Sequence, residues 1–196
     1  MELRTWRLVY GQTQQEKIMY YKEDKSFLHN KDKDYIEKVI LGNQFPFFLM
    51  NDGVGTGEGN SWLSHTIVER KELRPKGYKV ESPYYGFFLN MLESFAKKND
   101  IPNGELLRCS INFTFPDKKN KSEIHQDHSF PHKQLIIYLN DSLDKRATTV
   151  ILDDDKKTVL KEIEPEQFKG VCFETKPHYL YYPRYGYRVI CVYTFN

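Results

Sequence analysis

The sequence has few cysteines and no long apolar run. Only three cysteines occur among the 196 residues, Cys109, Cys172 and Cys191, and none forms a Cys-x-x-Cys pair. All three lie in apolar, strand-like segments, so we expect buried, reduced thiols in a cytoplasmic protein. No window approaches the roughly 20 apolar residues of a membrane helix. Residues 1–10 also lack the apolar centre of a secretory signal.

The chain also lacks an excess of charge of either sign. Its 29 Lys and Arg against 27 Asp and Glu give a formal net charge of +2. This balance gives no electrostatic reason to expect tight binding to nucleic acid or to a membrane, although a local basic patch would not change the total. Aromatic residues are abundant instead, with 14 Tyr and 13 Phe, which favours a β-rich protein.

The first half of the chain predicts a support for the core rather than the core itself. Residues 12–34 are polar and predict surface structure, while 33–41 predict a short helix and 45–50 a buried strand. The Gly-rich stretch 51–60 predicts a loop, which we interpret as a flap, and 62–68 predict another strand. Ser82 is a good N-cap and Pro83 suits the first helical position, so a helix is expected over 83–98. We interpret residues 1–103 as this support and a lid.

Residues 104–196 have a different pattern. Short β-branched or aromatic segments, separated by turn signals, predict about six to eight antiparallel strands without a helix between them. The segments are 106–115, 133–139, 148–152, 158–163, 170–173 and 187–195. We therefore expect a mostly β, single-domain protein with flanking helices, built as a sandwich, jelly roll or barrel. The helix over 83–98 would pack on the outside of the sheet.

Two histidines and one aspartate have the spacing of a metal site. His125 and Asp127 are two residues apart, so on an extended segment their side chains point the same way. His178 follows 53 residues after His125. Two imidazoles and a carboxylate on one face of an octahedral iron leave three positions open, as in non-haem Fe(II) oxygenases. His-x-Asp alone is a weak signal, and the alternative is a solvated loop plus a core histidine.

Arg188 provides a further signal, ten residues after His178. Residues 183–186 between them predict a turn, which would bring the guanidinium back towards the same pocket. A buried arginine suits a carboxylate because it can form paired hydrogen bonds with it.

Together, His125-x-Asp127, His178 and Arg188 resemble the pattern of the Fe(II)/2-oxoglutarate dioxygenase superfamily. The closest resemblance is to its prolyl-4-hydroxylase-like branch and to small phage-encoded members. Residues 133–140 (KQLIIYLN) are similar to the Tyr-Leu-Asn strand of that branch, and 163–173 are similar to the turn and strand before its distal histidine. The resemblance covers 104–196. At 145–147 (KRA) the sequence departs from the usual Gly-Gly, which leaves the register of the next strand open.

The resemblance implies a double-stranded β-helix (jelly-roll) core with Fe(II) held by His125, Asp127 and His178. It implies 2-oxoglutarate and O2 as co-substrates, with Arg188 on the far carboxylate of 2-oxoglutarate. Tyr138 and Asn112 match positions that help to bind the co-substrate.

The implied activity is hydroxylation of a substrate, with succinate and CO2 as co-products. The resemblance favours a protein or peptide substrate. Two alternatives stay open: an oxygenase acting on a nucleobase or small metabolite, and a β-sandwich binding module without iron chemistry. The sequence determines neither the substrate nor the oligomeric state.

Three other histidines could contribute to a site. His128 and His132 are four apart, but Pro131 lies between them and disfavours a helical metal pair. We expect them to be structural, with contact to substrate as the alternative. His65, on a predicted strand, is expected to be a hydrogen-bonded structural residue.

Overall fold

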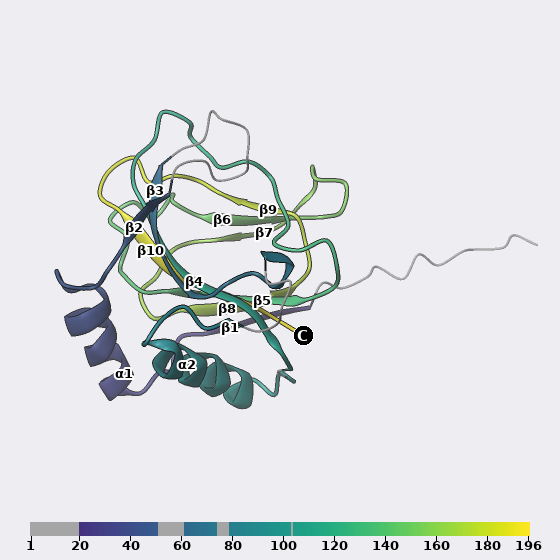
Figure 1. Cartoon of the computed structure of the whole chain (residues 1–196). Helices are drawn as coiled ribbons and strands as arrows, with labels where there is room; N and C mark the ends of the chain where they lie inside the picture. Colours follow the sequence, from purple (N-terminus) through teal and green to yellow (C-terminus); the bar gives the residue numbers. More distant parts are fainter. Residues whose placement is uncertain (1–19, 51–60, 74–78, 103) are drawn as a thin grey trace, which may run out of the picture.

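Two antiparallel sheets face each other in the computed structural model, which describes residues 20–50, 61–73, 79–102 and 104–196 (Figure 1). The large sheet has seven strands in the order β1 (Tyr21–Asp24), β8 (Gly170–Glu174), β5 (Lys133–Tyr138), β10 (Arg188–Phe195), β4 (Leu106–Thr114), β3 (Trp62–Val68) and β2 (Phe48–Met50). The small sheet has the order β7 (Val159–Ile163), β6 (Thr149–Leu152) and β9 (His178–Leu180). This is a mostly β, jelly-roll architecture, as predicted.

The helical elements lie on the side of the large sheet that faces away from the small one (Figure 1). They are α1 (Asn30–Tyr35), a π-helical turn η1 (Ile36–Ile40) and α2 (Tyr85–Lys98). A separate short 3-10 turn, η2 (Lys71–Leu73), follows β3. The buried face of α2 includes Phe88, Leu92 and Phe95, which pack in one cluster with the large sheet. The predicted packing of this helix outside the sheet is therefore confirmed.

Strict alternation along β4, β5 and β10 separates the core from the pocket. Odd-numbered side chains such as Ile111, Ile137 and Cys191 join the apolar cluster under the helices. Even-numbered side chains such as Asn112 and Gln134 line a pocket between the two sheets. This follows from the two-residue period of a strand, which sends neighbours to opposite faces.

Helix α2 begins later than the sequence predicts. Ser82 is not its N-cap and Pro83 is not helical: the helix runs over Tyr85–Lys98 and its N-cap is Tyr84. The Ser82 hydroxyl is engaged elsewhere, because it accepts the Tyr84 N–H at 3.1 Å and lies 2.8 Å from Nε2 of His65. The other ring nitrogen of His65 lies 2.6 Å from the Pro46 carbonyl. His65 is thus a structural link between the start of α2 and the segment before β2.

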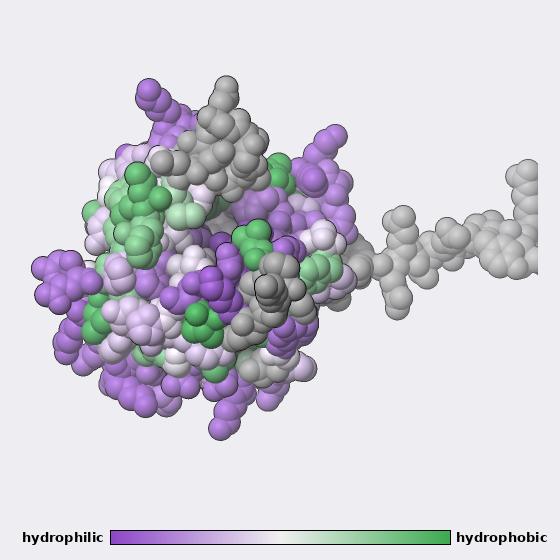
Figure 2. Space-filling view, in the orientation of Figure 1, coloured by the Kyte–Doolittle hydropathy of each residue, from purple (hydrophilic) through white to green (hydrophobic). Residues whose placement is uncertain are grey.

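One prediction for the first half is wrong. The apolar run 45–50 forms only the short strand β2, and its side chains are exposed, Phe48 by 61% and Leu49 by 62%. Figure 2 shows an apolar area on the side of the molecule where β2 lies. The polar stretch 12–34 contains the strand β1, which pairs with β8. The expected flap at 51–60 lies outside the described residues.

The remaining strand predictions hold within one or two residues. All three cysteines are buried and free, as expected. None of the helices in the described ranges is long and apolar enough to cross a membrane.

Candidate metal and co-substrate site

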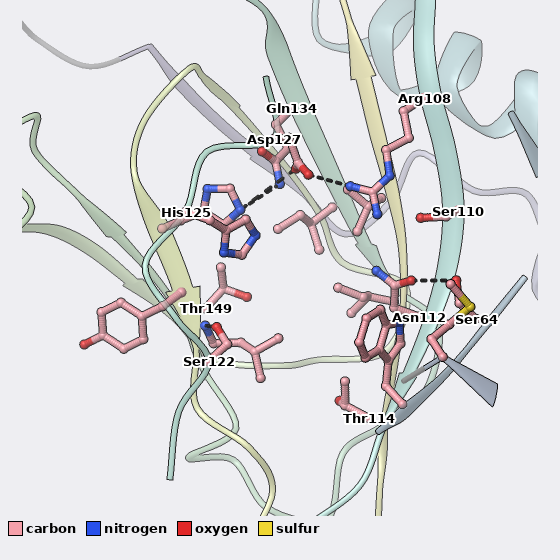
Figure 3. Close-up of a pocket in the computed structure, with 18 of the residues that line it drawn as sticks. Ser64, Arg108, Ser110, Asn112, Thr114, Ser122, His125, Asp127, Gln134 and Thr149 are labelled. Carbon is pink, nitrogen blue, oxygen red and sulfur yellow. Dashed lines mark hydrogen bonds and ion pairs between the residues drawn. The ribbon is translucent and has the colours of Figure 1, made fainter. Parts of the chain in front are cut away.

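A pocket of about 550 Å³ lies between the two sheets (Figure 3). One wall is the inner face of β4, which presents Arg108, Ser110, Asn112 and Thr114. Figure 3 shows His125 and Asp127 on the opposite side of the space from Asn112. The pocket therefore has polar groups on both sides of a space large enough for a small molecule.

His125 and His178 are brought together by the backbone. Their N–H and C=O groups form a two-way antiparallel bridge, with N···O distances of 3.0 and 2.9 Å. The two rings lie side by side with centroids 4.5 Å apart. The Nδ1 atom of each ring lies 3.0 Å from a backbone carbonyl, that of Glu123 for His125 and that of Lys176 for His178. A carbonyl only accepts, so each Nδ1 carries a proton, and in the neutral form of each ring the lone pair is on Nε2.

Burial lowers the pKa of His178 to about 4, and the neighbouring charge of His125 acts in the same direction. The imidazole is therefore neutral near pH 7, which is the form that binds a metal. Its Nε2 lies 3.3 Å from the side-chain amide of Gln134 and 4.0 Å from Oδ2 of Asp127.

Asp127 is a buried carboxylate between two arginines. Its Oδ1 accepts hydrogen bonds from Arg70 at 2.8 Å and from Arg108 at 2.5 Å. Burial alone would raise the pKa of Asp127, but the positive charge of Arg108, followed by the charges of His178 and Arg70, holds it well below its usual range. Asp127 is thus an anion near neutral pH.

Arg188 also lines the pocket and is incompletely paired. The residue is only 1% exposed, and its Nη2 donates to Oγ1 of Thr149 at 2.6 Å. Its Nε and Nη1 are buried without a hydrogen-bond partner among the described residues. Leaving a charged donor buried and unpaired costs at least several kcal/mol in an apolar setting. Such a group fits a site that receives a carboxylate.

Tyr138 and Asn112, the other two predicted co-substrate residues, have different positions. The Tyr138 hydroxyl lies 3.0 Å from Oγ1 of Thr149, and its ring lies 5.3 Å from the guanidinium carbon of Arg188. Tyr138 therefore packs behind Arg188. Asn112 lines the pocket directly, and its Oδ1 accepts from Ser64 at 3.0 Å, which turns the amide nitrogen towards the space in Figure 3.

One pair of the predicted ligand atoms lies close to the separation that a metal requires. Within the described ranges, no three His, Cys, Asp or Glu side chains already surround a common metal position. However, His178 Nε2 and Asp127 Oδ2 are 4.0 Å apart, whereas adjacent donors on an octahedral ion with bonds of about 2.1 Å are roughly 3 Å apart. A shift of about 1 Å would close this gap. Two histidines and one carboxylate are also the ligand types of a non-haem Fe(II) site.

His128 and His132 are structural residues next to this site. His128 is buried with Nδ1 2.5 Å from Glu72 and Nε2 2.7 Å from the Thr194 hydroxyl, so both its nitrogens are engaged. His132 packs edge-on against it and lies 3.1 Å from the Thr175 hydroxyl. Neither lines the pocket among the described residues.

Sequence analysis gave no role to Arg70, Arg108, Gln134 or Thr149, all of which line the pocket. For Arg108 and Gln134 a signal was present, since each is a long polar side chain within a predicted strand whose other face is apolar. Arg70 follows β3 and carries no such signal, because only the folded chain brings it to Asp127.

No protein-family model matches the sequence, and no curated protein has detectable sequence similarity to it. Its fold, in contrast, is similar to many solved structures. An oxidoreductase of the 2OG-Fe(II) oxygenase family from Burkholderia pseudomallei is 15% identical with a TM-score of 0.71, covering 90% of this chain and 84% of that one. A prolyl-4-hydroxylase from Pseudomonas putida is 12% identical with a TM-score of 0.56, covering 90% and 92%.

A third similar structure is a prolyl hydroxylase from Trichoplax adhaerens in complex with a peptide fragment of the hypoxia inducible factor oxygen degradation domain. It is 11% identical with a TM-score of 0.58, covering 89% of this chain and 83% of that one. At these identities the similarity concerns the fold. The chain therefore has the fold of the 2-oxoglutarate- and Fe(II)-dependent oxygenases, including the prolyl hydroxylases, as the sequence resemblance implied.

Proposed function

We propose that the chain is an Fe(II)- and 2-oxoglutarate-dependent oxygenase that hydroxylates a protein or peptide. One observation carries the proposal. A buried arginine with two unpaired nitrogens, Arg188, lines the same pocket as His125, Asp127 and His178. A binding module without iron chemistry would have no need to bury that charge in one pocket with two histidines and a carboxylate.

In this proposal Fe(II) is held by Nε2 of His125, Nε2 of His178 and Oδ2 of Asp127. When bound, the metal supplies the oxidative chemistry that converts 2-oxoglutarate to succinate and CO2 and hydroxylates the substrate. The backbone carbonyls at Nδ1 of each histidine fix the tautomer and the direction of the ring. These contacts prepare the ligand atoms before a metal arrives.

Arg188 binds the far carboxylate of 2-oxoglutarate through its unpaired Nε and Nη1. Thr149 supports the guanidinium through Nη2, and Tyr138 holds the Thr149 hydroxyl in turn. Asn112 directs its amide nitrogen into the same space and can donate to an oxygen of the co-substrate. All of these contacts lie in the pocket between the two sheets.

Two features support a peptide substrate. The rim of the pocket includes apolar and aromatic residues, among them Met50, Trp62 and Tyr182, which suit an amino-acid side chain and its neighbours. In addition, several proteins with this fold are prolyl hydroxylases, and one of them was solved with a peptide. Proline within an extended peptide is therefore the first residue to test.

The test is succinate formation, followed by mass spectrometry of candidate peptides. We expect slow succinate release from Fe(II) and 2-oxoglutarate alone, faster release with a proline-containing peptide, and a gain of one oxygen on that peptide. His178→Ala should abolish succinate formation, whereas His29→Ala, at an exposed helix start, should not. Absence of both metal binding and succinate would favour a binding module. Succinate without any oxidised peptide would favour a nucleobase or small-metabolite substrate.

A further inference from the structure

Both arginines next to Asp127 bind the same carboxylate oxygen. Arg108, from the central part of the large sheet on β4, and Arg70, from the segment after β3, both donate to Oδ1. Arg70 also donates to the backbone carbonyl of Asp127. No hydrogen bond from a described residue reaches Oδ2, which faces Nε2 of His178 at 4.0 Å. Oδ1 thus accepts from both arginines, whereas Oδ2 faces His178 in the pocket.

Charge neutralisation alone does not require this arrangement. Asp144 is another carboxylate that is 2% exposed, like Asp127, and it pairs with Arg184 through both of its oxygens, at 2.9 and 3.1 Å. That fork-to-fork geometry is the usual one for a structural pair. At Asp127, two guanidiniums instead share one oxygen, although each repels the other. In this arrangement Oδ2 of Asp127 accepts from neither arginine and instead faces Nε2 of His178.

The two arginine side chains also differ in their solvent exposure. The Arg108 side chain is 17% exposed, whereas that of Arg70 is 35% exposed at the rim of the pocket. Although it is more exposed, Arg70 donates hydrogen bonds to both the backbone carbonyl and the side chain of Asp127. Together they restrain the carboxylate from two directions, so rotation about its side-chain bonds would break at least one charge-assisted hydrogen bond.

We propose that Arg70 and Arg108 are positioning residues for the metal: by holding Oδ1 of Asp127, they present Oδ2 as its single ligand atom. This inference rests on the proposed function, because it assumes that Asp127 binds a metal. Groups that orient a metal ligand from behind typically contribute 10–100-fold, as an order of magnitude, to metal affinity. Simple Coulomb repulsion predicts the opposite, since removing a positive charge near the site should favour a cation.

The test is titration of the apoprotein with Co(II) alone, followed by the visible absorption of the bound ion. We expect Arg108→Met and Arg70→Met each to weaken Co(II) binding by about 10–100-fold and to change the shape of the absorption band. Arg108→Lys, which keeps the charge and one donor, should recover part of the affinity. Arg184→Met is the matched control, because it removes an arginine from a buried aspartate outside the pocket, and it should leave Co(II) affinity unchanged.

Unchanged or tighter Co(II) binding by both methionine variants, with wild-type circular dichroism, would overturn the inference. If Arg108→Met does not fold, the more exposed Arg70→Met gives the answer by itself. If the wild-type protein binds no Co(II) and forms no succinate with Fe(II), the proposed function fails and the inference fails with it. If the wild-type protein binds Co(II) and the arginine variants bind it equally well, only the inference fails.

Discussion

Replacing Arg188 with methionine should make the protein more stable and less able to bind 2-oxoglutarate. Methionine has a similar length but removes the guanidinium, whose Nε and Nη1 are buried without partners among the described residues. An unsatisfied buried polar group costs about 1–3 kcal/mol, and more when it is charged. The Tyr138 ring, 5.3 Å from the guanidinium carbon, offsets part of that through a cation–π contact. We therefore expect a net gain of about 2 kcal/mol in the apoprotein.

For a chain of this length, a gain of about 2 kcal/mol corresponds to a rise of about 4–8 °C in melting temperature. Binding of the co-substrate should change in the opposite direction. Each hydrogen bond to a charged group contributes about 1.5–3 kcal/mol, so losing two of them costs about 3–6 kcal/mol. The dissociation constant of 2-oxoglutarate should then rise by about 10²–10⁴-fold.

The assay combines thermal unfolding in the presence of a chelator with equilibrium binding of 2-oxoglutarate in the presence of Mn(II). Arg184→Met is the control, because that exposed guanidinium is fully paired with Asp144 and lies outside the pocket. It should neither stabilise the protein nor alter co-substrate affinity. A lower melting temperature for Arg188→Met, together with unchanged binding of 2-oxoglutarate, would show that Arg188 is a structural residue and would refute the reasoning.

Three further outcomes are expected. Thr149→Val should weaken 2-oxoglutarate binding by less than Arg188→Met does, since it removes only the hydroxyl at Nη2, and titration of both variants compares them. Gly170→Ala should destabilise the protein by about 1–3 kcal/mol in urea unfolding, because a Cβ there would lie 2.6 Å from the Phe95 ring. Burial lowers the pKa of His65, so the unfolded chain takes up the proton first and stability falls as the pH drops below about 6.5. Urea unfolding at about pH 7 and about pH 5 should show this loss in the wild type and a smaller loss in His65→Gln.

The strands could be predicted because their sequence pattern is local. Residues 106–115 have apolar side chains at every second position, residues 135–139 are a short apolar run, and β4 and β5 form there. The pairing of β1 with β8 could not be predicted, because the polar residues of β1 carry no pattern and join a strand almost 150 residues away. The apolar run at 45–50 was misinterpreted as buried for a similar reason. Whether such a strand is covered depends on its neighbours, and β2 lies at the end of the sheet.

The residue types of the candidate site could be predicted from spacing, but their support could not. His125 and Asp127 are two residues apart and a predicted turn connects His178 to Arg188, so short-range geometry grouped each pair. Only the resemblance to the oxygenase superfamily joined the two pairs across 53 residues. The two arginines on Asp127 come from positions 57 and 19 residues away, and their meeting depends on the register between strands of the large sheet. No local sequence pattern predicts this register.

The alternation along β4, β5 and β10 also explains how the fold can hold an unpaired charge. On one face of these strands, apolar side chains pack against α2 and bury a large cluster, which includes Phe88 and Phe95. Burial of that kind contributes about 25 cal/mol for each Å² of apolar surface, so the helix side can supply most of the stability of the sheet. The opposite face is then free to carry polar groups such as Arg188, next to a second apolar cluster that includes Ile136 and Val192. Substitutions at odd-numbered positions of these strands should therefore affect folding, and substitutions of the polar even-numbered residues, such as Asn112 and Arg188, should affect binding. A shift of register by one residue would exchange the two faces, so the same alternation that builds the core also keeps the polar groups directed into the pocket.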